Sequence, residues 1–336
     1  MKAMTPIAPS LVPAEPAGAF IGRDASPRRP SWGAGESLGP VSVPAAVEQA
    51  GVGLVGVLAE LFKVRLTGLV LMTTAVGFYV GFRGPMDYLL MLHTLIGTAL
   101  VASGASALNQ LIERDYDARM HRTQDRPLPS GRLQPATVLL IGVACAVFGI
   151  VYLARLVNLA ACLVSASSLL CYLFVYTPLK RVTWLNTLAG AVAGALPPLI
   201  GWAGARGGLG GAGWALFAIQ ALWQLPHFFS IAWLYRGEYA RAGFKMLPLF
   251  DPLGRRTARQ ALGWTLVLLP LSLCPYLFSL AGLVYLAGAL LLGLAFLWTA
   301  VQFALQRNDS SARLLFFLSI LYLPLLLAVM VLDKVK

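Results

Sequence analysis

The sequence has few charged residues for its length. Of its 336 residues, 12% are Asp, Glu, Lys or Arg, about half the share found in a typical soluble domain. In contrast, 58% are hydrophobic and the mean hydropathy is +0.74. So few charges cannot cover the surface of a soluble particle of this size. The composition therefore excludes a soluble enzyme and a secreted disulfide scaffold, and it indicates a polytopic membrane protein.

Cysteine is also scarce, with four residues in the whole chain. All four lie in apolar segments without Cys-x2-Cys spacing, so neither a zinc site nor a disulfide framework is indicated. The isoelectric point near 9.9 would suggest a nucleic-acid partner in a soluble protein. In a membrane protein it indicates basic loops on one face of the bilayer, so we expect contact with lipid and none with nucleic acid.

Two regions differ in composition. Residues 1–55 are rich in Pro, Ala and Gly and lack sustained apolar periodicity, which predicts a disordered cytoplasmic tail without a signal peptide. Residues 56–336 alternate long apolar runs with short polar breaks, which predicts an all-α membrane domain of nine transmembrane helices. The expected spans are 64–82, 88–112, 135–154, 157–176, 185–204, 213–235, 260–280, 283–304 and 312–332.

The basic residues indicate the orientation of this domain. Of the 26 Lys and Arg residues, 21 fall in the N-terminal segment and in the loops after even-numbered spans. Because Lys and Arg accumulate in cytoplasmic loops, we expect these segments to be cytoplasmic and the C-terminus to lie on the opposite side. Most acidic residues outside the tail fall in two of the same loops, 109–132 and 236–259, so polar chemistry gathers on one face.

The first of these loops contains a candidate metal site. Asn109, Glu113 and Asp117 follow one another at four-residue spacing, which places them on one face of a helix. Oxygen ligands of this kind suit Mg²⁺, which commonly shares its coordination shell with substrate phosphates. Arg122 and Arg126 follow, and arginine binds phosphate oxygens in bidentate fashion. The alternative is an amphipathic loop whose Glu and Arg side chains only neutralise one another.

Two further segments carry candidate site residues. Tyr176 and Lys180 share a helix face near Arg181 and can contact a diphosphate, although topology alone also requires basic residues there. His227 lies inside a span, beside Pro226, where an ionisable side chain is a functional candidate. The alternative for His227 is a buried imidazole that bonds to a neighbouring helix. Other candidates follow it: Glu238 as a second metal ligand, and Arg236 and Lys245 as substrate contacts.

Together these segments resemble the UbiA superfamily of intramembrane prenyltransferases, and within it the branch that farnesylates haem. The resemblance covers roughly residues 57–332. It is based on the segment from Asn109 to Leu128, on Tyr176-Thr-Pro-Leu-Lys180-Arg181, on Gly194-Ala-Leu-Pro-Pro-Leu-Ile-Gly201-Trp202 and on Trp223-Gln-Leu-Pro-His227-Phe. Glu238 is followed three residues later by Ala242, where many superfamily members have a second Asp. A single acidic residue followed by a tyrosine, here Tyr239, is similar to the haem-modifying branch, although that branch usually has Asp.

The resemblance implies a Mg²⁺-dependent enzyme of the bacterial inner membrane. Its substrates would be farnesyl diphosphate and haem B, its product haem O, and a downstream haem-handling or oxidase-assembly protein would receive that product. The alternatives are a UbiA-type enzyme that prenylates an aromatic quinone precursor, and a transporter. Carried over by motif, Asn109, Glu113, Asp117 and Lys180 would be catalytic, the first three and Glu238 would bind metal, and Arg122, Arg126, Tyr176, Arg181, His227, Arg236, Tyr239 and Lys245 would bind substrate.

Overall fold

The computed structural model describes residues 53–335, so the predicted disordered tail lies outside the described residues except for Gly53–Val55, the last two of which begin the first helix. The remainder is helical, and among the described residues the only β pairing is an isolated bridge between Ala281 and Lys334. The elements are α2 (Leu54–Leu61), α3 (Val64–Gly81), α4 (Tyr88–Asp117), α5 (Pro135–Leu156), α6 (Leu159–Leu170), the π-helical turn η1 (Cys171–Tyr176), α7 (Thr177–Val182), α8 (Asn186–Arg206), α9 (Gly210–Leu234), α10 (Arg236–Ala242), the 3₁₀ turn η2 (Leu247–Phe250), α11 (Arg255–Leu271), α12 (Cys274–Leu277), α13 (Leu283–Gln306) and α14 (Asp309–Leu332).

Nine helices among the described residues are long and apolar enough to cross a membrane, which confirms the predicted fold class of a polytopic all-α protein. Three boundaries differ from the sequence prediction by five or more residues. The second span continues to Asp117 instead of ending at 112, the fourth continues to Val182 instead of ending at 176, and the seventh begins at Arg255 instead of 260. All three extensions contain polar residues, which hydropathy alone assigns to loops. The first of them keeps the candidate metal ligands on one continuous helix.

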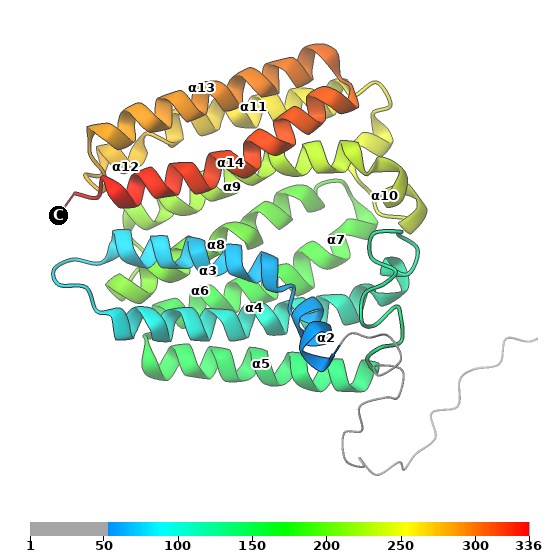
Figure 1. Ribbon diagram of the computed structural model, residues 1–336, viewed down its shortest axis with the longest axis horizontal. Helices are drawn as coiled ribbons and strands as arrows, with labels where there is room; N and C mark the ends of the chain where they lie inside the picture. Colours follow the sequence, from blue (N-terminus) through cyan, green and yellow to red (C-terminus); the bar gives the residue numbers. More distant parts are fainter. Residues whose placement is uncertain (1–52, 336) are drawn as a thin grey trace, which may run out of the picture. The chain divides into compact units, whose positions relative to one another are not determined.

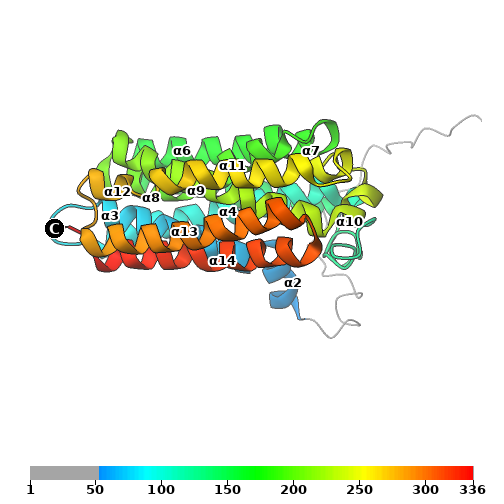
Figure 2. The same ribbon diagram turned by 90° about the horizontal axis from the view of Figure 1, so that it is seen from above.

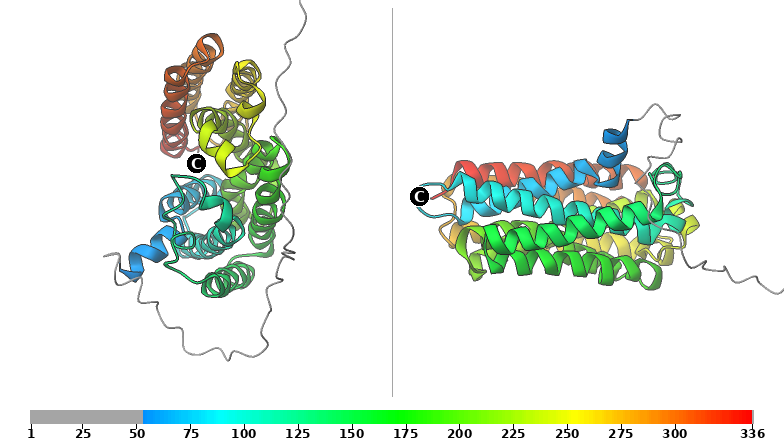
Figure 3. Two further views of the ribbon diagram at one scale, coloured as in Figure 1. Left: turned by 90° about the vertical axis from the view of Figure 1, so that its right-hand side faces the viewer. Right: turned by 90° about the horizontal axis from the view of Figure 1, so that it is seen from below.

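The helix ends place the polar loops of the even-numbered spans together. Figures 1 and 2 show α7 and α10 at one end of the bundle, with the C-terminus and α12 at the other. At the second end the chain turns through capped helices: Asp87 accepts a hydrogen bond from the Leu90 amide at the start of α4, and Asn158 accepts one from the Ala161 amide at the start of α6. Seen end-on in Figure 3, loop 118–134 and α10 lie over the ends of the helices.

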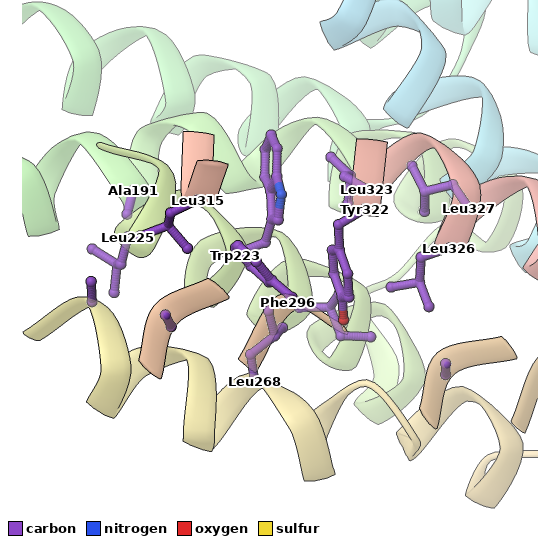
Figure 4. Packing of buried hydrophobic residues seen from close by; sticks show 14 of the residues in the cluster. Ala191, Trp223, Leu225, Leu268, Phe296, Leu315, Tyr322, Leu323, Leu326 and Leu327 are labelled. Atoms are coloured by element: carbon purple, nitrogen blue, oxygen red, sulfur yellow. The ribbon is translucent and has the colours of Figure 1, made fainter. Parts of the chain in front are cut away.

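The largest apolar core joins α9 to the last three transmembrane helices. Its fully buried side chains include Phe229 of α9, Phe296 of α13 and Tyr322 of α14. Figure 4 shows the side chains of Trp223 and Tyr322 among the other labelled residues of this core. The Trp223 indole N–H donates to the Ser319 carbonyl over 2.7 Å, which satisfies the one polar atom of a large buried ring. This half of the bundle is a packed support for α9, which carries His227.

Helices α3 and α8 cross so closely that their contact requires glycine on both sides. A Cβ atom built on Gly77 of α3 would overlap the Pro198 carbonyl of α8, and one built on Gly201 of α8 would overlap the Thr74 carbonyl of α3. Backbone atoms cannot move aside as flexible side chains do. The small-residue spacing of the sequence therefore marks a true helix crossing.

We expect Gly77→Ala to destabilise the protein by about 3 kcal/mol or more, because the added methyl group meets backbone and overpacking strains a closed core. Gly68→Ala is the matched control on the same helix, since nothing lies within 4 Å of a Cβ built there. Thermal unfolding in detergent measures both variants. Equal melting temperatures for the two variants would contradict the close crossing.

Candidate active site

The three candidate metal ligands lie on one buried face of α4. Asn109, Glu113 and Asp117 are 1%, 3% and 1% exposed. Asp115, two residues before Asp117, points away from them and pairs with Arg114 on the surface over 3.2 Å. Four-residue spacing on a continuous helix therefore does bring the amide and the two carboxylates to one side.

A cation accompanies each of these three side chains, and each comes from a different part of the chain. Lys63, before α3, donates to the Asn109 amide oxygen over 3.0 Å. Lys180 of α7 donates to both Glu113 oxygens over 2.8 and 3.1 Å. Arg126 donates to Asp117 Oδ2 over 2.6 Å. The buried cluster thus sets three basic side chains against two carboxylates, an arrangement that suits an anionic ligand.

The position of Lys180 depends on a π-helical turn. Residues Cys171–Tyr176 wind with the wider π spacing directly before Pro178, which lacks an amide proton and would clash with the carbonyl four residues back in a regular helix. The Thr177 hydroxyl donates to the Tyr172 carbonyl, five residues back, and accepts from the Asn109 amide. The turn directs Tyr176 and Lys180 together toward α4.

Tyr176 has room at this position because Gly190 lies opposite it. A Cβ built on Gly190 would lie 2.7 Å from the Tyr176 ring. The Lys180 ammonium lies 4.4 Å from the centroid of the same ring, within the range of a cation–π contact. The predicted pairing of Tyr176 with Lys180 is therefore present, and Gly190 is the small residue that permits it.

The segment after α10 is fastened to the same turn. The Lys245 amide donates to the Lys180 carbonyl over 2.7 Å, and the Asn186 side chain donates to the Lys245 carbonyl over 2.8 Å. The neighbouring Phe244 ring stacks on Tyr116 of α4, with 5.6 Å between centroids. These contacts join α4, α7, α8 and the loop after α10 into one wall around Lys180.

Lys63 is a site residue that sequence reasoning missed, because a basic residue just before a span is explained by topology alone. It has a left-handed backbone conformation with φ of 49°, which is uncommon for a residue other than glycine. Burial, together with the positive charges of Arg126 and Lys180, lowers the pKa of Lys63 to about 7. The contact of Lys63 with Asn109, which is 46 residues away in the sequence, exists only in the folded chain.

Loop 118–134 brings the second acidic segment toward the first. The Arg122 amide donates to Glu238 over 3.4 Å, and the Arg122 guanidinium lies 3.5 Å from the Tyr239 hydroxyl. The Thr123 hydroxyl donates to the Asp117 carbonyl over 2.8 Å. The exposed Arg122 and the half-buried Glu238 and Tyr239 therefore form the rim of the cluster that contains Arg126.

Three predicted substrate contacts lie apart from the cluster. Arg236 pairs with Asp309 of α14 over 3.0 Å. Arg181 lies over the Tyr116 ring at 4.1 Å and donates to the Ile112 carbonyl. The Lys245 side chain is exposed, and only its backbone contributes to the wall described above. The structure thus does not bring these three side chains to Glu113 and Asp117.

A cavity of about 350 Å³ extends from this cluster into the bundle between α3, α4, α6, α8 and α9. Lys63 and Tyr176 lie at its charged end. Most of its lining is apolar, with a few hydroxyl and amide groups deeper in. Along the fourth span the lining residues are Ser165, Ser168, Leu169, Tyr172 and Tyr176, which recur at helical spacing. The site therefore combines a charged head with an apolar tunnel.

His227 lines the same cavity but is already engaged by its neighbours. Its Nδ1 atom lies 2.7 Å from the Ser319 hydroxyl of α14. Its ring stacks between Trp223 and Phe316, with centroids 5.3 Å away on each side. The bond to a neighbouring helix is the alternative that the sequence left open, and it coexists with a place in the cavity wall.

The donor set fits a divalent cation that shares its shell with a substrate. Among residues 53–335, no three His, Cys, Asp or Glu side chains lie close enough together to hold a metal on their own. However, Asp117 Oδ1 is buried and has no hydrogen-bond partner, which is costly for a carboxylate oxygen unless a ligand occupies that position. Asn109, Glu113 and Asp117 would supply oxygens, and a phosphate group would supply the rest.

Comparison with known sequences places this site in a known family. The model of the UbiA prenyltransferase family matches residues 70–321. The protoheme IX farnesyltransferase of Solibacter usitatus is 50% identical over 284 residues, covering 82% of this chain and 97% of that protein. The protoheme IX farnesyltransferase of Salinibacter ruber is 43% identical over 273 residues, covering 81% and 96%.

Solved structures share the fold at much lower identity. A structure of digeranylgeranylglyceryl phosphate synthase superposes with a TM-score of 0.72 at 16% identity and covers 83% of this chain and 98% of that one. A UbiA homologue from Archaeoglobus fulgidus bound to GPP and Mg²⁺ superposes with a TM-score of 0.58 at 17% identity, covering 82% and 99%. The arrangement of helices is therefore that of a membrane prenyltransferase.

Proposed function

Because the chain belongs to the UbiA prenyltransferase family, we propose that it transfers the farnesyl group of farnesyl diphosphate to a vinyl side chain of haem B, giving haem O. The bond between the allylic carbon and the diphosphate oxygen breaks, and a vinyl carbon bonds to the farnesyl carbon. Water supplies a hydroxyl group to the other vinyl carbon and loses a proton, and diphosphate departs. The names of the two relatives described above support haem as the acceptor.

The observation that carries the proposal is the excess of basic over acidic side chains at the mouth of the apolar cavity. Lys63, Lys180 and Arg126 face only two carboxylates, Glu113 and Asp117, and all five groups are fixed by hydrogen bonds or ion pairs. Such donors stabilise the negative charge that develops on a departing diphosphate. Lys180 can release Glu113 and turn to the leaving oxygen, because its flexible stem ends in a single point charge.

The same cluster supports Mg²⁺ as the cofactor. The Archaeoglobus homologue binds GPP with Mg²⁺, and the unpartnered Asp117 Oδ1 supplies a position for a metal in this chain. Asn109, Glu113 and Asp117 would hold the ion, which would supply Lewis-acid stabilisation of the diphosphate. Glu238 lies at the rim, bonded to the Arg122 amide, and can reach such a shell only if that contact opens.

The depth of the cavity supports a farnesyl chain. Tyr176 lies at its charged end and Ser165 at the far end of the same span, eleven residues away, which corresponds to about 16 Å at helical rise. On α8, the stretch from Gly190 to Ile200 corresponds to about 15 Å. An extended farnesyl main chain of about twelve carbons is also about 15 Å long on ordinary bond geometry. The apolar lining would keep water from an allylic cation.

The test uses the purified full chain in lipid nanodiscs with farnesyl diphosphate, haem B and Mg²⁺. We expect haem O by mass spectrometry and one diphosphate released per haem O, and loss of both products when EDTA removes the metal. A second arm supplies an aromatic acid in place of haem B. Prenylation of the aromatic acid without haem O would establish the quinone-precursor alternative, and absence of diphosphate release in both arms would overturn prenyl transfer altogether.

Filling the floor of the cavity should shorten the accepted prenyl chain. We expect Ser165→Phe to lower kcat/KM for farnesyl diphosphate at least about 10-fold and to favour geranyl diphosphate, because the lost space matches the terminal isoprene unit. Ser167→Phe is the control, since Ser167 lies two residues on along the same helix and is exposed. An unchanged preference in Ser165→Phe would contradict the proposed path of the chain.

We also propose that the charged end of the bundle faces the cytoplasm in a bacterial inner membrane. The Lys and Arg asymmetry supports this orientation. Because an odd number of spans separates the two ends, α2 and the C-terminus lie at opposite ends of the bundle. A reporter enzyme that works only outside the cytoplasm should be active when it is fused after Lys336. An inactive fusion of this kind, together with activity of a reporter that works only in the cytoplasm, would show the opposite orientation.

A further inference from the structure

A second hollow lies on the other side of the wall that carries Lys180. It is a groove of about 500 Å³ at the charged end of the bundle, between the turn after α7, the η2 turn and the first turns of α11. It shares no lining residue with the farnesyl cavity. Its lining combines apolar and basic side chains: Val182, Trp184, Leu247, Phe250, Arg256 and Arg259.

The groove carries uncompensated positive charge. Arg256 and Arg259 line it and are exposed, and within residues 53–335 neither forms an ion pair with an acidic side chain. The nearest acid in the sequence, Asp251, is buried and accepts from both the amide and the hydroxyl of Thr257. That carboxylate is committed to the start of α11 and does not neutralise the groove.

The apolar part of the groove lies where the membrane boundary falls. Val182 ends the fourth span and Arg255 begins the seventh. Val182 is 73% exposed and Phe250 is 52% exposed. Trp184 lies two residues after Val182, and tryptophan is typical of the level of the lipid headgroups. The groove therefore offers guanidinium groups beside an apolar surface at the depth where headgroups meet acyl chains.

From this geometry we infer that the groove binds an anionic phospholipid of the surrounding leaflet. The phosphate lies between Arg256 and Arg259, and an acyl chain lies along Val182 and Phe250. Basic pockets between transmembrane helices on the cytoplasmic side recognise lipid headgroups by the same combination of charges. Arginine suits the phosphate because its planar donors engage two oxygens at once.

Haem B, a substrate of the proposed reaction, is also an amphipathic anion, but it fits this groove less well than a phospholipid. The lining contains no His, Cys, Met or Tyr side chain that could coordinate iron. In addition, the groove shares no lining residue with the cavity of the active site, so a porphyrin held here would not face Glu113.

A lipid in this groove would support the catalytic turn from behind. Val182 lies two residues after Lys180, and Leu247 lies two residues after Lys245. Lys180 and Lys245 are joined by a backbone hydrogen bond in the wall described above. An occupant packed on the nearby Val182 and Leu247 would therefore favour the arrangement in which Lys180 faces α4. Because the groove is separate from the farnesyl cavity, binding of anionic lipid should be detectable without farnesyl diphosphate and without haem B.

The test compares two doubly substituted chains in phosphatidylcholine nanodiscs titrated with phosphatidylglycerol. We expect R256Q/R259Q to bind phosphatidylglycerol about 25-fold more weakly than the wild type, at about fivefold per arginine near a lipid surface. R241Q/R255Q removes the same charge from exposed positions outside the groove and should retain wild-type binding. Native mass spectrometry counts the bound lipids, and thermal unfolding shows that all chains are folded.

Three results would overturn the inference. Equal loss in both double variants would show a general surface-charge effect, and unchanged binding in R256Q/R259Q would show that the groove is not the site. Displacement of bound phosphatidylglycerol by equimolar haem B or by millimolar inorganic phosphate would assign the groove to the porphyrin or to a free anion. Because binding is measured without farnesyl transfer, failure here leaves the proposed reaction untouched.

Discussion

Asp117→Asn should lower the rate of farnesyl transfer by about 100- to 1,000-fold while the protein remains folded, a loss typical of removing one electrostatic contact to the transition state. Asp117 is the residue whose Oδ1 is buried without a partner and whose Oδ2 accepts from Arg126. The amide keeps the shape of the side chain but removes the negative charge that a metal requires. Haem O formation at saturating Mg²⁺ measures the loss.

Asp115→Asn is the matched control for this variant. Asp115 lies on the same helix two residues earlier, is exposed, and pairs only with Arg114. We expect it to retain full activity. If Asp117→Asn also retained full activity, or if raising the Mg²⁺ concentration had no effect on the apparent affinity of the wild type for farnesyl diphosphate, the metal assignment on α4 would be wrong.

Lys180→Met should remove activity and stability together. Lys180 holds both oxygens of the buried Glu113, so its loss leaves an uncompensated carboxylate in the bundle. Breaking one side of a buried ion pair typically costs about 3–5 kcal/mol of folding free energy. In addition, the leaving diphosphate loses a cation, so we expect farnesyl transfer to fall at least about 100-fold. Thermal unfolding and haem O formation measure the two effects separately.

The double variant E113Q/K180M separates the structural effect from the catalytic one. With the carboxylate neutralised, most of the lost stability should return, because no charge is left buried without a partner. Activity should stay low, since neither the negative charge of the metal-binding carboxylate nor the cation is restored. Recovery of activity along with stability would mean that Lys180 acts only by keeping the protein folded. Arg114→Met provides the exposed comparison, and removing that surface pair should change stability by less than about 1 kcal/mol.

Much of the fold was predictable from the sequence because apolar runs, charge asymmetry and helical spacing are local properties. Nine spans follow from hydropathy, and the four-residue spacing of Asn109, Glu113 and Asp117 fixes a common face wherever the helix lies. Boundaries were less predictable. Hydropathy assigns the polar segments Arg114–Asp117 and Arg255–Arg259 to loops. In the structure they extend α4 and α11, because each added turn continues the backbone hydrogen bonding of its helix.

Candidate site residues were predictable as a class but not individually. Three basic residues end or follow spans on the same side of the membrane domain: Arg126, Lys180 and Arg181. Membrane topology alone accounts for a basic residue at each of these positions. The structure brings Lys180 to Glu113 and Arg126 to Asp117, whereas Arg181 packs on Tyr116. Lys63 gave no local signal beyond its charge, since its role depends on a contact with Asn109, 46 residues away.

The scarcity of charge, the one-sided placement of Lys and Arg and the periodic oxygen ligands determined, by themselves, a membrane bundle with polar chemistry on one face. Those features are set by solvation and helix geometry, which each segment carries independently. Only the tertiary structure decided which cations join the carboxylates, how deep the apolar cavity is, and that a basic groove lies behind the Lys180 wall. The π turn before Pro178 brings Lys180 to α4, the crossing helices α3 and α8 both line the cavity, and the groove lies where the turn after α7, η2 and α11 meet. Each of these contacts joins segments that are distant in the sequence, so no local pattern predicts it.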